Sequence, residues 1–104
     1  MKDLTASQLT NQAMLTLAGR QCFVWRNNNL AVRGRSFIGL KGVPDIVGFQ
    51  INTGVAVYCE VKTVNDKMSD HQIEFMIRAK KAGCFCLVAT DEHGKLKLTE
   101  WQYD

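Results

Sequence analysis

The sequence predicts an α/β fold in which a mixed β-sheet is flanked by helices. Two segments have helical periodicity, and each begins with a capping box, Thr5-Ala6-Ser7-Gln8 and Ser69-Asp70-His71-Gln72. Three short apolar segments with strand character lie between them, and another follows the second helix. A strand, a helix and a strand in succession indicate a crossover that joins two parallel strands. The predicted order is therefore α-β-β-β-α-β.

The first half of the chain contains one helix, one strand and a loop. The helix extends to about Ala18 and ends at Gly19. One stripe of this helix is apolar and would face the core: Leu9, Ala13 and Leu17. A strand follows at residues 22–25, where we expect Trp25 to lie in the core, with base stacking as the alternative. Residues 27–42 are rich in Asn, Gly and Arg and predict a long surface loop of the kind that often carries function.

The second half contains the remaining strands. Residues 46–51 and 55–63 predict two strands joined by a turn at 52–54. The second helix extends to about Ala82 and stops at Gly83, and a buried strand follows at 84–89. A short additional strand is expected at 95–99, after a turn.

The composition is that of one small globular domain, which we assign to residues 1–104. No apolar run reaches the roughly 18 residues of a membrane span, and the first residues lack an apolar signal segment. We therefore expect a cytoplasmic protein that does not cross a membrane. In that reducing setting the four cysteines would be free thiols.

Positive charge is concentrated in the first half of the chain. The formal net charge is +3, and residues 1–44 contain a single acid, Asp3, among six bases. Such an asymmetry suits a polyanionic substrate; the alternative is scattered charge that only aids solubility. Four of these bases flank the expected mouth of the site described next and are candidate DNA-binding residues: Arg26, Arg33, Arg35 and Lys41.

The candidates for chemistry are Asp45, Glu60 and Lys62. Glu60 and Lys62 are two residues apart at the end of a predicted strand, so both side chains leave the same face. Asp45 begins the neighbouring strand, and a hairpin would bring it to the same place. Two carboxylates can bind a hard divalent cation, and an adjacent amine can orient or deprotonate a water. These are the groups needed to hydrolyse a phosphodiester.

The alternative reading of these residues is structural. Asp45 could be a turn residue after Pro44, and Glu60 and Lys62 could be a solvated pair on an edge strand. The neighbouring runs are apolar, however, which indicates buried strands. Charges that point inward there would cost several kcal/mol without a metal or a partner, so the context favours a functional site.

These motifs, in this order, resemble the PD-(D/E)xK nuclease superfamily and, within it, small stand-alone members of the VRR-Nuc branch of the phage or prophage kind. The matching segments are Phe23-Val24-Trp25-Arg26-Asn27, Gly42-Val43-Pro44-Asp45-Ile46, Glu60-Val61-Lys62-Thr63, Ser69-Asp70-His71-Gln72, and Gly83 before an apolar strand. The resemblance covers most of the chain, from about Leu9 to Ala89. It implies a restriction-endonuclease-like core.

The resemblance also implies roles for individual residues. Asp45, Glu60 and the Val61 carbonyl would be ligands of Mg²⁺ or Mn²⁺, and Lys62 would act on the attacking water. Gln72 matches a glutamine that many members carry near the site; its alternative duty is to close the capping box of its own helix. Members often carry a glutamate on the first helix as well, where this chain has only amides: Gln8, Asn11 and Gln12.

The function predicted from these observations is a metal-dependent endonuclease that cuts DNA, with branched or nicked DNA as substrate and a homodimer as the assembly. The missing carboxylate on the first helix supports an alternative, a catalytically impaired nuclease-fold module that binds DNA or assists assembly. A third reading is a nuclease directed at RNA, which competition between DNA and RNA would separate from the first.

Overall fold

In the computed structural model, the chain is described over residues 3–27 and 40–103. The elements in these ranges are α1 (Ala6–Gly19), β1 (Cys22–Arg26), β2 (Ile46–Gln50), β3 (Ala56–Lys62), α2 (Asp70–Lys81), β4 (Phe85–Glu92) and β5 (Lys95–Glu100). This order confirms the predicted succession, and the short additional strand is present as β5. Most of the loop expected at 27–42 lies outside the described residues.

Both helices begin as the capping boxes predict, with Thr5 and Gln8 at α1 and Ser69 and Gln72 at α2. The helix α2 ends before Gly83, whose φ of +92° is a conformation that glycine adopts without strain. The end of α1 differs from the prediction. Gly19 is still helical, and the left-handed residue is Gln21, with a φ of 62°.

The five strands form one sheet in the order β1-β2-β3-β4-β5. The pairs β1–β2 and β2–β3 are antiparallel, and the second is closed by a turn in which Gly54 has a φ of +74°. The strands β3 and β4 are parallel and are joined through α2, as the predicted crossover requires. The hairpin β4–β5 is antiparallel, so the sheet is mixed.

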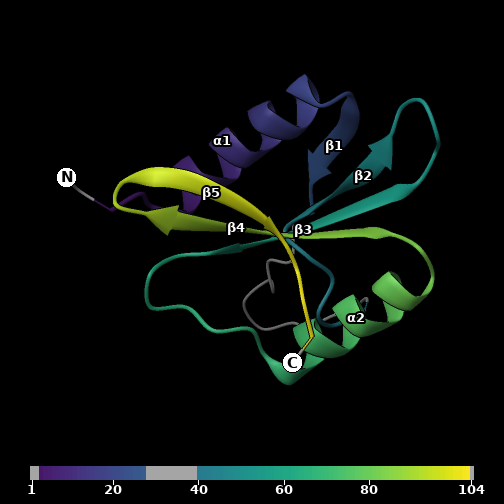
Figure 1. Cartoon of the computed structure of the whole chain (residues 1–104). Helices are drawn as coiled ribbons and strands as arrows, with labels where there is room; N and C mark the ends of the chain where they lie inside the picture. The colour runs from purple at the N-terminus through teal and green to yellow at the C-terminus, as the bar shows by residue number, and fades with distance from the viewer. Residues whose placement is uncertain (1–2, 28–39, 104) are drawn as a thin grey trace, which may run out of the picture.

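Each helix covers one face of this sheet, and Figure 1 shows α1 and α2 on opposite sides of the strands. The α1 core contains Leu9, Ala13 and Leu17 with strand residues that include Ile46, Val57, Cys59 and Val61. The α2 core contains Met76, Ala79, Cys86 and Trp101, with Tyr58 packed against them. Because side chains alternate along β3, Glu60 and Lys62 point toward the α2 face.

Two expectations about burial have different outcomes. All four cysteines are free, and Cys22, Cys59 and Cys86 are buried, as predicted. Trp25 was expected in the core, and this is wrong, because its side chain is 48% exposed. It lies on the edge strand β1, where α2 does not cover the sheet. Neither α1 nor α2, the helices of the described ranges, is long and apolar enough to cross a membrane.

Candidate active site

Asp45 lies where three strands come together. The register that pairs Ile46 with Cys59 and Val47 with Tyr58 continues to Asp45 opposite Glu60. The Asp45 carbonyl accepts from the Asn27 N–H at 2.8 Å, and its Oδ2 accepts from the Val61 N–H, also at 2.8 Å. The carboxylate therefore bridges β2 and β3 just beyond the end of their ladder.

The approach to Asp45 depends on Gly42. This residue has a φ of +87°, and a Cβ built on it would lie 2.3 Å from the His71 carbonyl oxygen. Only glycine lets the chain pass so close to the first turn of α2. Pro44 follows and is fully buried. The Gly42–Asp45 segment is thus held against the helix that carries Gln72.

Glu60 is the buried acid of the site. Its side chain is 0% exposed, Oε1 accepts from Gln72 Nε2 at 3.4 Å, and Oε2 is buried without a hydrogen-bond partner in the described part of the chain. Burial, and then the adjacent Asp45 carboxyl, raise the pKa of Glu60 to about 9; Lys62 acts in the opposite direction. The site thus holds a carboxyl that lacks a counter-charge sufficient to keep it ionised.

Lys62 leaves the same face two residues further along β3. Its Nζ donates to Gln72 Oε1 at 2.9 Å and to the Lys67 carbonyl at 3.5 Å. These contacts hold the amine at the edge of the site, where the side chain is half-buried.

Gln72 performs the structural duty and also contacts the site. Its Oε1 accepts from Ser69 N at 2.8 Å to close the capping box, and the same oxygen accepts from Lys62. Its Nε2 reaches Glu60. The two readings of Gln72 made from the sequence are therefore compatible, because one amide links the start of α2 to both charged groups of β3.

The Val61 carbonyl faces the same side as Asp45. In an extended strand, the N–H and C=O of one residue point to the same edge, and the Val61 N–H bonds to Asp45 Oδ2. The ladder between β2 and β3 ends at Cys59, so the Val61 carbonyl lies beyond its last pair. Its position is compatible with the ligand role expected from the sequence.

The donor set fits a hard divalent cation, although it is small. Two carboxylates and a carbonyl supply only oxygen atoms, which Mg²⁺ and Mn²⁺ prefer, and the orphaned Glu60 Oε2 has an unused acceptor. Within residues 3–27 and 40–103, however, no group of three or more His, Cys, Asp or Glu side chains comes together.

The amides of α1 do not enlarge this set in the described contacts. Gln8 Oε1 accepts from the Thr5 N–H in the capping box at 2.9 Å. Asn11 and Gln12 are exposed, and α1 packs on the face opposite to Glu60. The hydrogen bonds of the described ranges join none of the three to Asp45 or Glu60.

The candidate DNA-binding residues lie in different parts of the structure. Lys41 is exposed and lines a hollow of about 390 Å³ together with Leu40, His71, Glu74, Phe75 and Arg78. Arg26 is exposed at the end of β1, but its pairing with Ile46 puts it on the α1 side of the sheet, away from Glu60. Arg33 and Arg35 lie outside the described residues.

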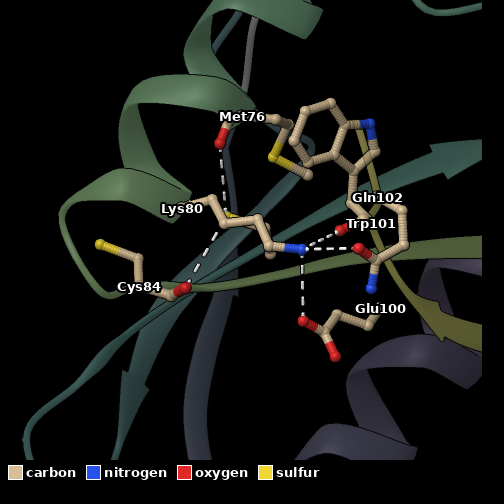
Figure 2. Close-up of polar contacts among 7 residues, drawn as sticks. Met76, Lys80, Cys84, Glu100, Trp101 and Gln102 are labelled. Carbon is tan, nitrogen blue, oxygen red and sulfur yellow. Dashed lines mark hydrogen bonds and ion pairs between the residues drawn. The ribbon is translucent and has the colours of Figure 1, made fainter. Parts of the chain in front are cut away.

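The basic side chains of Arg78 and Lys80 on α2 both have partners. Arg78 is paired with Glu74 at 2.8 Å, and both side chains are well exposed. Lys80 is engaged elsewhere: its Nζ donates to the Trp101 carbonyl at 2.8 Å and lies 3.4 Å from Glu100, as Figure 2 shows. Lys80 therefore attaches the C-terminal segment to α2.

Sequence reasoning missed Phe23 and Phe49 on the site face, and it placed Trp25 in the core with base stacking as the lesser alternative. Phe23, Trp25 and Phe49 are exposed by 58%, 48% and 40%. The signal was present, because Phe23 and Trp25 alternate with the buried or half-buried Cys22 and Val24 and so had to emerge on the other face of the strand.

Similar folds occur among solved structures. Archaeoglobus fulgidus Hjc, a Holliday junction resolvase from an archaeal hyperthermophile, has a TM-score of 0.60 and 16% identity over 90% of this chain and 75% of that one. A structure described as a VRR_NUC domain has a TM-score of 0.55 and 26% identity, over 82% and 84%. The sheet, the two helices and the Pro44-Asp45 and Glu60-Val61-Lys62 motifs together define a restriction-endonuclease-like fold of the PD-(D/E)xK superfamily.

The family follows from the sequence profile. The VRR-NUC domain profile matches residues 11–91, which is most of the chain. A search of curated proteins found no match. The chain belongs to the VRR-NUC domain family, as the motifs had indicated.

Proposed function

We propose that this protein is a metal-dependent DNA endonuclease that hydrolyses phosphodiester bonds in branched or nicked DNA. The observation that carries the proposal is the Glu60 carboxyl, which is fully buried, lies beside Asp45 and has an oxygen without a partner in the described structure. A buried carboxyl is costly unless something compensates it. Membership of a nuclease family makes a catalytic cation the natural compensation.

Asp45, Glu60 and the Val61 carbonyl would hold Mg²⁺ or Mn²⁺. The bound ion would polarise the scissile phosphate and lower the pKa of a coordinated water. The protein's own contribution would be to bring these oxygens together from two strands, which the hydrogen bond from the Val61 N–H to the Asp45 carboxylate links. Glu60 would lose its proton to become a ligand, because a carboxyl binds a cation in its ionised form.

Lys62 would act on the attacking water and on the charge that develops at the phosphate. Its Nζ is held by Gln72 Oε1 at 2.9 Å, which limits the rotation of a long side chain. An ammonium group in this position can donate to a water or to a phosphate oxygen. Gln72 would be a positioning residue, because it contacts both Lys62 and Glu60.

The substrate class rests on charge and on relatives. Lys41 lies in the hollow beside the first turn of α2, and with Arg33 and Arg35 it would contact phosphates. The likeness in fold to a Holliday junction resolvase supports branched DNA. A homodimer would present two sites to a two-fold junction.

The test is cleavage of four-way, nicked and linear duplex DNA by purified protein with Mg²⁺, Mn²⁺ or EDTA. We expect metal-dependent cutting of branched or nicked DNA, abolished by Asp45→Asn and by Glu60→Gln. Glu92→Gln is the matched control, since Glu92 is an exposed acid that pairs with Lys97 and does not line the hollow that contains Lys41. Full activity of either site variant would overturn the assignment.

The second candidate is a nuclease-fold module that binds DNA without cutting it. The small donor set and the amides on α1 favour it. Binding of branched DNA without cleavage under any divalent metal would support this function, and cleavage would exclude it. Preferential cleavage of RNA in a competition assay would favour an RNA-directed nuclease.

A further inference from the structure

Three exposed aromatic side chains form one cluster on β1 and β2. Phe23 and Phe49 are paired across the strands, with ring centroids 5.5 Å apart and an interplanar angle of 19°. Trp25 meets Phe23 edge to face at 6.0 Å. All three are at least 40% exposed. We call Phe23, Trp25 and Phe49 the aromatic platform.

The platform is on the same face of the sheet as the candidate active site. Trp25 pairs with Val47, and Val47 pairs with Tyr58, so the three share a face. Glu60 is the next residue of that face after Tyr58, and Asp45 precedes Val47 on it. Trp25 is therefore a diagonal neighbour of Asp45, a relation that spans roughly 7–8 Å in an antiparallel pair.

The helix α2 covers only part of this face. It packs on β4 and reaches β3 through Phe75, which meets the Tyr58 ring at 4.8 Å. Lys41, His71 and Arg78 line the hollow next to Phe75, together with Glu74, which pairs with Arg78. The site face thus presents an aromatic surface, the paired acids, and a hollow lined by three basic side chains and Glu74.

This combination fits unpaired nucleobases. Exposed aromatic rings stack on bases of any sequence, and neighbouring cations contact the phosphates. Neither β1 nor β2 contains an acid that would repel a nucleic acid. Bases within a duplex are already stacked on one another, so only unpaired or flipped bases can use such a surface.

We propose that the aromatic platform stacks unpaired bases of the DNA strand next to the phosphodiester that is cut. This rests on the proposed nuclease function, and it adds that the enzyme reads single-stranded nucleotides at a branch or nick. The occupant is DNA, because the platform adjoins the paired acids and a hollow that carries basic groups.

The test uses tryptophan fluorescence, since the two tryptophans differ in environment. Trp101 is 7% exposed and lies in the α2 core, whereas Trp25 is on the platform. A Trp101→Phe variant leaves Trp25 as the only tryptophan. We expect a short oligothymidylate in EDTA to quench Trp25, and an abasic oligomer of equal length to leave its emission unchanged. In Trp25→Thr, where Trp101 remains, no quenching is expected.

Affinity provides the second readout. Trp25→Thr and Phe49→Thr should each weaken oligothymidylate binding by about tenfold, without weakening binding of the abasic oligomer. Phe85→Thr is the matched control, because Phe85 is 47% exposed but pairs with Val57 on the α1 face. Equal affinity of the unaltered protein for both oligomers would overturn the proposal without requiring any variant to fold.

Three further outcomes are decisive. If sedimentation finds a dimer that Trp25→Thr dissociates, and Trp25 is not quenched by oligothymidylate, the platform is an interface between copies and the proposal fails. Base-dependent quenching by a protein that cuts no DNA with metal present would support the platform while the proposed nuclease function fails. Metal-dependent cleavage of DNA without quenching of Trp25 would support the proposed nuclease function, while the proposal for the platform would fail.

Discussion

Replacing Glu60 by glutamine should stabilise the metal-free protein, and the gain should grow with pH. Unfolded Glu60 has its ordinary pKa of 4.5, and the fold raises it to about 9. Between these values the folded state holds a proton that the unfolded state has released, so stability falls as pH rises. Below 4.5 both states are protonated, and above 9 both are ionised, so the effect of this group levels off.

The magnitude follows from the slope of this dependence. One group contributes at most about 1.4 kcal/mol per pH unit, so from pH 5 to pH 8 the wild type would lose about 4 kcal/mol through Glu60. Glutamine does not titrate, and its side chain is neutral and nearly the same size as the protonated acid. Glu60→Gln should therefore match the wild type near pH 5 and be about 3 to 4 kcal/mol more stable at pH 8.

Urea unfolding in EDTA, followed by circular dichroism at several pH values, measures this difference. Glu74→Gln serves as the control and should change stability by less than about 0.5 kcal/mol at every pH, as exposed pairs do. Adding Mg²⁺ should narrow the gap, because a cation that binds the ionised site stabilises only the wild type. Parallel pH dependences of the wild type and Glu60→Gln would refute the reasoning.

Three further predictions concern the groups around the acids. Lys62→Ala should lower the cleavage rate by about 10²-fold or more while calorimetry finds Mg²⁺ affinity retained, because the amine is not a ligand; abolished metal binding with an intact rate would contradict this role. Gln72→Ala and Ser69→Ala should each cost about 1 kcal/mol of stability through the capping box. Only Gln72→Ala should also reduce the rate, because the side chain of Gln72, unlike that of Ser69, contacts Lys62; equal rates would leave Gln72 with a purely structural duty. Replacing Arg33, Arg35 and Lys41 together by alanine should weaken DNA binding. In Glu60→Gln protein, the slope of log affinity against log salt should become less steep by about 0.9 for each duplex phosphate that the variant no longer neutralises. An unchanged slope would mean that DNA contacts other basic residues, with Arg78 and Lys81 of α2 as the next candidates.

The order of elements was readable from the sequence because each depends on local signals. Two capping boxes predict where the helices begin, and Gly54 and Gly83 mark a turn and a helix end that need positive φ. The crossover through α2 follows from chain length and handedness. Glu60 and Lys62 share a face by strand alternation alone.

What the sequence by itself determined, then, was the fold class and the group of residues that meet at the end of β3. The tertiary structure decided their surroundings, because burial and pairing depend on residues far apart in the chain. Asp45 reaches the Val61 N–H, and Gln72 joins its own capping box to Lys62, only after β2, β3 and α2 have packed. In the same way Trp25, apolar and expected inside, is exposed because β1 is an edge strand and α2 stops short of it.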